Sequence, residues 1–125
     1  MAKFASSTFI DGAFNTIKAN AAAINYRLCS AQPTTLIEAN TTYPLASTTL
    51  NKTTEITLAA GDTSGRKMTI SAKAAVAVTT SGTATHVSID DGTTLLFVTT
   101  TTSQAVSAGG TVDIGAWKDE IAAVA

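Results

Sequence analysis

The stretch HVSIDDGTTLLFVTTTT, residues 86–102, predicts two antiparallel strands joined by a tight connection. Val87 and Ile89 alternate with polar residues, which indicates a strand with one apolar face and one polar face. The Asp-Asp-Gly run at 90–92 favours the connection, because Asp readily adopts turn conformations and Gly allows a positive φ. We therefore expect the two strands to contribute to the centre of a β core.

Strand-like runs continue on both sides of this hairpin. Six short runs rich in β-branched residues lie between residues 54 and 117, and turn signals separate them about every ten residues. This spacing is typical of an antiparallel β-sandwich or a barrel-like domain, so the fold class is predicted to be mainly β. The runs are TEITLAA, RKMTISA, AAVAVTT, ATHVSI, TLLFVTT and GTVDIGAW.

The N-terminal part predicts an α-helix that ends near Asn20 and is followed by a first extended segment, INYRLCS. Ser6, Ser7 or Thr8 is expected to cap it, with Asp11 in its first turn. Its apolar stripe packs either on the chain's own sheet or on a neighbouring subunit. We divide the single globular unit into an arm and helix, 1–24, and a β-rich part, 25–125. The stripe consists of Ile10, Phe14, Ile17, Ala21 and Ile24.

Two other segments give weaker signals. Pro33 and Pro44 predict an irregular segment from Gln32 to Leu50, with a single helical turn at TTLIEA. The tail WKDEIAAVA fits either an extension of the last strand or a short helical turn.

Charge and composition exclude several partners. Only 14% of the 125 residues are charged and the formal net charge is -1, without the clustered Lys and Arg that nucleic acid or an anionic membrane requires. The sequence contains no apolar run long enough to span a membrane and no signal-peptide pattern at its start, so synthesis in the cytoplasm is expected. With Cys29 as the one cysteine, no internal disulfide can form.

The residues that could carry chemistry lack the partners that chemistry needs. A zinc site wants three or four ligands, and His86, the one histidine, lies more than fifty residues from Cys29. No Gly-x-Ser-x-Gly motif accompanies the histidine, so His86 is interpreted as a strand-surface or interface residue. The sequence therefore predicts no catalytic residue, no metal site and no cofactor.

Three further motifs are best interpreted structurally. GDTSGRK, residues 61–67, is one residue too short for a phosphate-binding loop and favours a strand connection. Asp90 and Asp91 lack the repeated oxygen ligands of a calcium loop, although ion binding stays open. Trp117, the one tryptophan, is expected to anchor the core or an interface.

Five stretches, in this order and nearly filling the chain, resemble a family of small structural proteins encoded by tailed bacteriophages and prophages. They are FIDGAFNTIKANA, LCSAQPTT, GDTSGRKMTI, SGTATHVSIDDGTTLLFVTT and GGTVDIGAW. The chain departs from the family pattern at Gly115, where Pro is expected. The closest agreement is at residues 81–84, 86–87, 91–92, 95–99, 110–112 and Trp117.

The resemblance implies a virion component, most simply a decoration or cement protein on the outer surface of the capsid. Its partners would be the major capsid protein and neighbouring copies, with a trimer as the expected oligomer. A tail, connector or fibre-base protein is the alternative, and a carbohydrate-binding module or small enzyme a more distant one. Contacts with the shell or between subunits are expected at Phe4, Phe9, Ile10, Phe14, Leu36, Tyr43 and Leu45.

Overall fold

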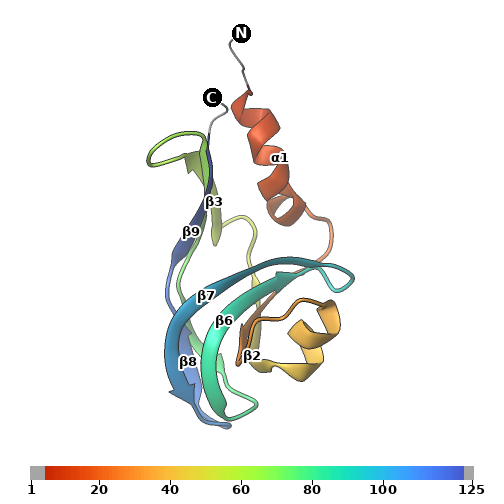
Figure 1. The fold of residues 1–125 in the computed structure, drawn as a ribbon, viewed down its shortest axis with the longest axis vertical. Coiled ribbons are helices and arrows are strands. Elements are labelled where there is room, and N and C mark those ends of the chain that lie inside the picture. Colours follow the sequence, from red (N-terminus) through yellow and green to blue (C-terminus); the bar gives the residue numbers. More distant parts are fainter. Residues whose placement is uncertain (1–4, 123–125) are drawn as a thin grey trace.

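A computed structural model describes residues 5–122 and confirms the predicted class: antiparallel sheets form a sandwich-like domain with one α-helix before them (Figure 1). The elements are α1 (Ser7–Lys18), β1 (Ile24–Cys29), the short π-helix η1 (Glu38–Thr42), β2 (Pro44–Leu50), β3 (Ile56–Ala60), β4 (Arg66–Ile70), β5 (Lys73–Ala77), β6 (Gly82–Asp90), β7 (Leu95–Val106), β8 (Thr111–Ile114) and β9 (Trp117–Ile121).

The first layer is a four-stranded sheet with the order β2-β1-β6-β7. The predicted hairpin forms its β6–β7 half, and Gly92 in the connection has a φ of +89°. Asp91 fixes this connection, because its Oδ1 accepts hydrogen bonds from the N–H groups of Thr93 and Thr94 at 3.0 and 2.7 Å. The local sequence therefore specifies the turn as predicted.

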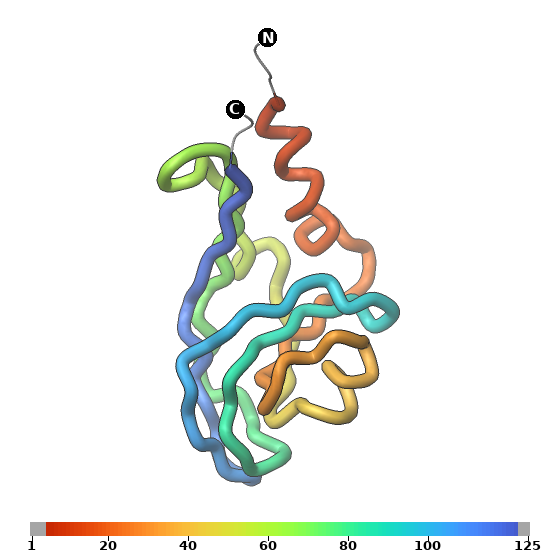
Figure 2. Tube along the Cα trace, in the orientation of Figure 1, coloured from red at the N-terminus to blue at the C-terminus, as the bar shows by residue number. Residues whose placement is uncertain are grey.

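The second layer consists of two antiparallel groups, β3-β4-β9 and β5-β8. β4 runs into β5 and β8 runs into β9 after two-residue interruptions, so the two groups form one long layer. Figure 2 shows this layer as the green and blue traces that run side by side along the molecule. The tail segment WKDEI is thus a strand. The first five residues of GDTSGRK, 61–65, connect β3 to β4, and Gly65 has a φ of +68°.

The core lies between the two layers. Tyr26 and Ile89 from the first layer and Met68 and Ile70 from the second are fully buried in one cluster. The layers join along one side, where Ala46 of β2 forms a β-bridge with Val78 beyond β5. This join makes the sandwich resemble a barrel that is closed on one side.

α1 packs against the chain's own sheet through Phe14 and Ile17, which are buried in the core cluster. Ser6 caps it, accepting a hydrogen bond from the Phe9 N–H. The first turn contains no acidic residue, so the predicted role of Asp11 there is wrong. Asp11 instead forms a two-point ion pair with Arg66 of β4, at 2.9 and 3.0 Å.

The segment predicted to be irregular contains a regular strand, β2, which is a correction to the sequence-based expectation. Pro44 stands at its first position, where a missing N–H does not interrupt the hydrogen-bond ladder. The predicted helical turn in TTLIEA has a counterpart in η1, which starts at Glu38, the fifth residue of that run.

The face of β6 predicted to be polar and exposed is buried instead. Ser88 and Asp90 are both 0% exposed, because β1 places polar partners beside them. The Asp90 carboxylate accepts hydrogen bonds from Arg27 Nε at 3.0 Å and from Asn25 Nδ2 at 2.8 Å. The outer face of this sheet therefore carries a hydrogen-bonded polar cluster with a buried ion pair.

The substitution Asp90→Ala is expected to lower the free energy of unfolding by about 3–5 kcal/mol, because it leaves the largely buried Arg27 guanidinium without its partner. Asp62→Ala is the matched control, since Asp62 is 43% exposed in its ion pair with Lys67 and should cost less than about 1 kcal/mol. Urea unfolding measures both values. Equal losses for the two variants would contradict the structural importance of the buried pair.

Asp91 should make stability depend on pH in the acidic range. Hydrogen bonds from Thr93 and Thr94 lower its pKa to about 2 in the folded chain, below the value of about 3.9 in unfolded chains. A lowered pKa stabilises the fold above pH 4, and this contribution is lost as the pH falls towards 2. Asp91→Asn should therefore be less stable than wild type at pH 5 and approach it near pH 2. A constant difference in thermal midpoint across this range would contradict the assignment.

Candidate functional site

The residues predicted to contact the shell or another subunit differ in their exposure to solvent. Phe9 on α1 is 78% exposed. Ile10, Leu36 and Tyr43 are half-buried, and Phe4 lies outside the described residues. Ile37, a residue that the prediction did not include, is 69% exposed beside η1. Phe9 and Ile37 are therefore the large apolar side chains that the described part of the chain leaves uncovered.

The prediction that Phe14 and Leu45 contact the shell or another subunit is wrong. Both are 3% exposed and belong to the core cluster, so neither is accessible to a partner of the folded chain. Phe14 faces the strands because the apolar side of α1 turns inward, and Leu45 lies beside the buried Ala46 near the start of β2.

His86 and Cys29 lie in neighbouring strands and pair in register, but they contact different groups. The His86 Nδ1 lies 2.9 Å from the hydroxyl of Thr85, and the buried Cys29 Sγ lies 3.7 Å from the hydroxyl of Ser88. Burial raises the pKa of the Cys29 thiol. Within residues 5–122, no group of three or more His, Cys, Asp or Glu side chains is arranged to hold a metal ion.

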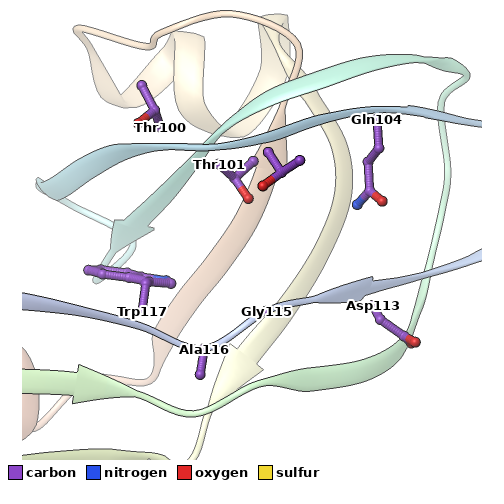
Figure 3. A pocket seen from close by; sticks show the side chains of 8 residues that line it. Thr100, Thr101, Gln104, Asp113, Gly115, Ala116 and Trp117 are labelled. Carbon is purple, nitrogen blue, oxygen red and sulfur yellow. The ribbon is translucent and has the colours of Figure 1, made fainter.

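A cleft of about 560 Å³ opens on the side of the sandwich opposite the join between β2 and β5. It separates β7 of the first layer from β8 and β9 of the second layer (Figure 3). Its volume lies within the range of ligand pockets, but most of its lining side chains are polar, whereas most ligand pockets are lined mainly by apolar ones. Its lining residues are Thr100, Thr101, Thr102, Gln104, Asp113, Gly115, Ala116 and Trp117.

The strand edges that border the cleft have no strand partner. β7 pairs only with β6, β8 only with β5, and β9 only with β4, as far as the described residues extend. An unpaired edge presents main-chain N–H and C=O groups that another strand can use. The cleft therefore offers main-chain hydrogen-bonding groups as well as side chains.

The side chains around the cleft are almost all neutral. Thr101 and Gln104 point from β7 towards the second layer, and neither side chain makes a hydrogen bond within the described part of the chain (Figure 3). Asp113 is the one charged lining residue, and its carboxylate turns away to accept a hydrogen bond from the Ala75 N–H at 2.9 Å. The cleft thus presents free hydroxyl and amide groups.

Trp117 forms one end of the cleft and is held in place from two sides. Its Nε1 donates a hydrogen bond to the hydroxyl of Tyr26 at 2.7 Å, and its ring stacks on Phe97 with centroids 5.4 Å apart and planes 9° from parallel. Tyr26 is fully buried, and this burial raises its pKa to about 12. The indole therefore has a fixed orientation, and one of its faces is already covered by Phe97.

β7 is irregular where it lines the cleft. Ala84 of β6 pairs with Gln104 of β7, and His86 pairs with Thr100. The two paired positions are two residues apart in β6 but four residues apart in β7, so β7 bulges. Such a bulge re-aims side chains and leaves main-chain groups unpaired. The bulge therefore directs the Thr-rich part of β7 towards the cleft.

These groups suit noncovalent recognition through hydrogen bonds and ring contacts. Of the residues that the sequence singled out, Trp117 and Gly115 line the cleft, and Thr100, Thr101 and Thr102 come from the end of the stretch 86–102. The contribution of β7 was missed, although one signal was present: the strand contains no charged residue and no Pro over its 12 residues. Edge strands usually carry such residues as protection against pairing.

Comparison with known proteins gives no relative: no protein-family model, no curated protein and no solved structure matches the chain. None of the helices found in residues 5–122 has the length and apolar character needed to span a membrane. The functional conclusions therefore depend on the residues, on their geometry and on the sequence resemblance described above.

Tyr26→Phe should lower the free energy of unfolding by about 1–2 kcal/mol, because it removes the acceptor of the Trp117 indole N–H. It should also change the near-ultraviolet circular dichroism of Trp117, the one tryptophan. Tyr43→Phe is the control, since the Tyr43 hydroxyl bonds the carboxylate of Glu38 at the surface and is expected to cost less than about 0.5 kcal/mol. An unchanged spectrum and stability for Tyr26→Phe would show that the bond does not fix the indole.

Proposed function

We propose that this chain is a non-catalytic structural protein of a phage virion, which binds the outer surface of the capsid shell as a decoration protein. The exposure of Phe9 and Ile37 is the observation that carries the proposal. Large apolar side chains that a small domain leaves this exposed are candidates for protein contacts. The choice of the capsid shell as the partner follows from the sequence resemblance to phage structural proteins.

The position of Phe9 supports a contact that the fold itself does not need. α1 already covers the core with Phe14 and Ile17, while Phe9 stays outside the core cluster. Burial of one such side chain on binding contributes about 1.5–3 kcal/mol. Phe9 is therefore well suited to anchor the domain on another protein surface without cost to its own stability.

The low charge of the chain supports a function in a crowded assembly. A formal net charge of -1 allows many copies to lie close together with little mutual repulsion. Modest contacts repeated through neighbouring copies then add up to firm attachment by multivalency. A symmetric oligomer, with a trimer as the leading form, fits this arrangement.

Phe9→Ser and Ile37→Ser test the proposal on shell particles that lack this protein, prepared from the phage or prophage that encodes it. Each substitution should weaken binding roughly 10- to 100-fold, because it removes about 1.5–3 kcal/mol of burial. The fold should be unaffected, since both side chains lie outside the core. Sedimentation with the particles measures the bound fraction.

Asn15→Ser is the matched control, an exposed position on the same helix. Wild-type chain that fails to bind the particles would refute the decoration function. The copy number in intact virions distinguishes a decoration protein from the alternative function. Hundreds of copies support decoration, whereas about six or twelve would indicate a tail, connector or fibre-base protein.

A further inference from the structure

The free edge of β7 differs from every other sheet edge in the described chain. β3 has five residues, β9 carries Lys118, Asp119 and Glu120, and β2 starts at Pro44. β2 is also covered in part, because its Leu45 carbonyl accepts hydrogen bonds from the N–H groups that follow Val78. β7 is 12 residues long and contains neither charge nor Pro. The bulge at residues 100–104 is one form of edge protection, but it also leaves main-chain groups of β7 without partners in β6, and these groups are available to another strand.

The shape of the cleft limits what can pair there. The stacked rings of Phe97 and Trp117, 5.4 Å apart, hold the two layers together at one end of the opening. The edge strand of a second folded copy would bring its own sheet with it and would meet β8 and β9. A single extended segment needs only the width of one strand, about 4.8 Å from the strand with which it pairs.

Main-chain chemistry favours a polypeptide over a sugar. The unpaired edge and the bulge of β7 supply main-chain N–H donors and C=O acceptors, which a peptide strand matches and a sugar does not. Trp117 would be the aromatic platform for a sugar, but Phe97 covers one of its faces. Since the only charged lining residue, Asp113, is already bonded to Ala75, the cleft offers no free charge to attract a charged segment.

We infer that the cleft receives an extended, uncharged segment of the shell protein, which pairs with the edge of β7 at residues 100–104 as an added strand. The segment closes the open side of the sandwich between β7 and the second layer. The free groups of Thr101 and Gln104 then bond to its main chain or to its hydroxyl and amide side chains. This inference rests on the proposed function, because it takes the shell protein as the partner.

Amide hydrogen exchange tests the strand directly, on wild-type chain alone and bound to shell particles that lack it. Those amides of residues 100–104 whose N–H groups point to the free edge of β7 should exchange about tenfold or more slowly on the particle, because pairing with an added strand engages only these N–H groups. This measurement needs no substitution, so it does not depend on how a variant folds. Residues 26–28 of β1, which lie in the centre of the first layer and pair with both β2 and β6, serve as the internal reference and should not change.

A pair of substitutions tests the same contact by binding. Thr101→Lys with Gln104→Lys places two charges in the neutral cleft and should weaken binding about tenfold or more. Thr57→Lys with Ala77→Lys adds the same charge at exposed positions on β3 and β5 and should bind within about threefold of wild type.

The outcomes separate this inference from the proposed function. Wild-type binding without slower exchange at residues 100–104, and with full binding of the cleft variant, would overturn the inference and leave the decoration function intact. Failure of wild type to bind the particles would overturn both. Quenching of Trp117 fluorescence by chitohexaose, without protection on the particle, would assign the cleft to a carbohydrate instead.

Discussion

The hydrogen bond from Trp117 to Tyr26, together with the stack on Phe97, is the constraint on which the arrangement of the two layers depends. Tyr26 belongs to the centre of the first layer, Phe97 to its edge, and Trp117 to the second layer. On the opposite side the layers are joined through the main chain, by the bridge of Ala46 with Val78. The aromatic contact therefore replaces, on the open side, the strand pairing that would have closed a barrel.

The contact of Trp117 with Tyr26 and Phe97 acts as a clamp between the two layers. It does not close the cleft between them, as pairing of strands across the layers would have done. Because the clamp acts through side chains at one end, the edges of β7, β8 and β9 stay unpaired, and the neutral cleft lies between them. The exposed Phe9 belongs to α1, which packs on β3 and β4 of the second layer. The proposed attachment thus combines an apolar anchor on the helix with strand pairing at the cleft, two contacts that differ in chemistry and position.

What could be predicted from the sequence was local. The run at 90–92 specifies a turn through its own side chains, and β-branched runs such as RKMTISA predict strands. The burial of Asp90 could not be predicted, because its partners Arg27 and Asn25 lie more than sixty positions away in the sequence. β2 was missed because Pro44 was interpreted as a breaker without knowledge of its place at the start of a strand. The cleft was missed because it depends on which strand edges face each other, which composition and periodicity do not determine.

The central claim is that this domain binds the capsid shell through Phe9, Ile37 and the cleft beside β7. A density map of the intact virion tests this claim most directly. The account predicts the domain on the outer surface of the shell at hundreds of positions, with Phe9 and Ile37 buried against other chains and an extended segment of shell protein beside residues 100–104. A domain found at the tail or connector in about six or twelve copies, with these residues exposed to solvent and the cleft empty, would contradict it.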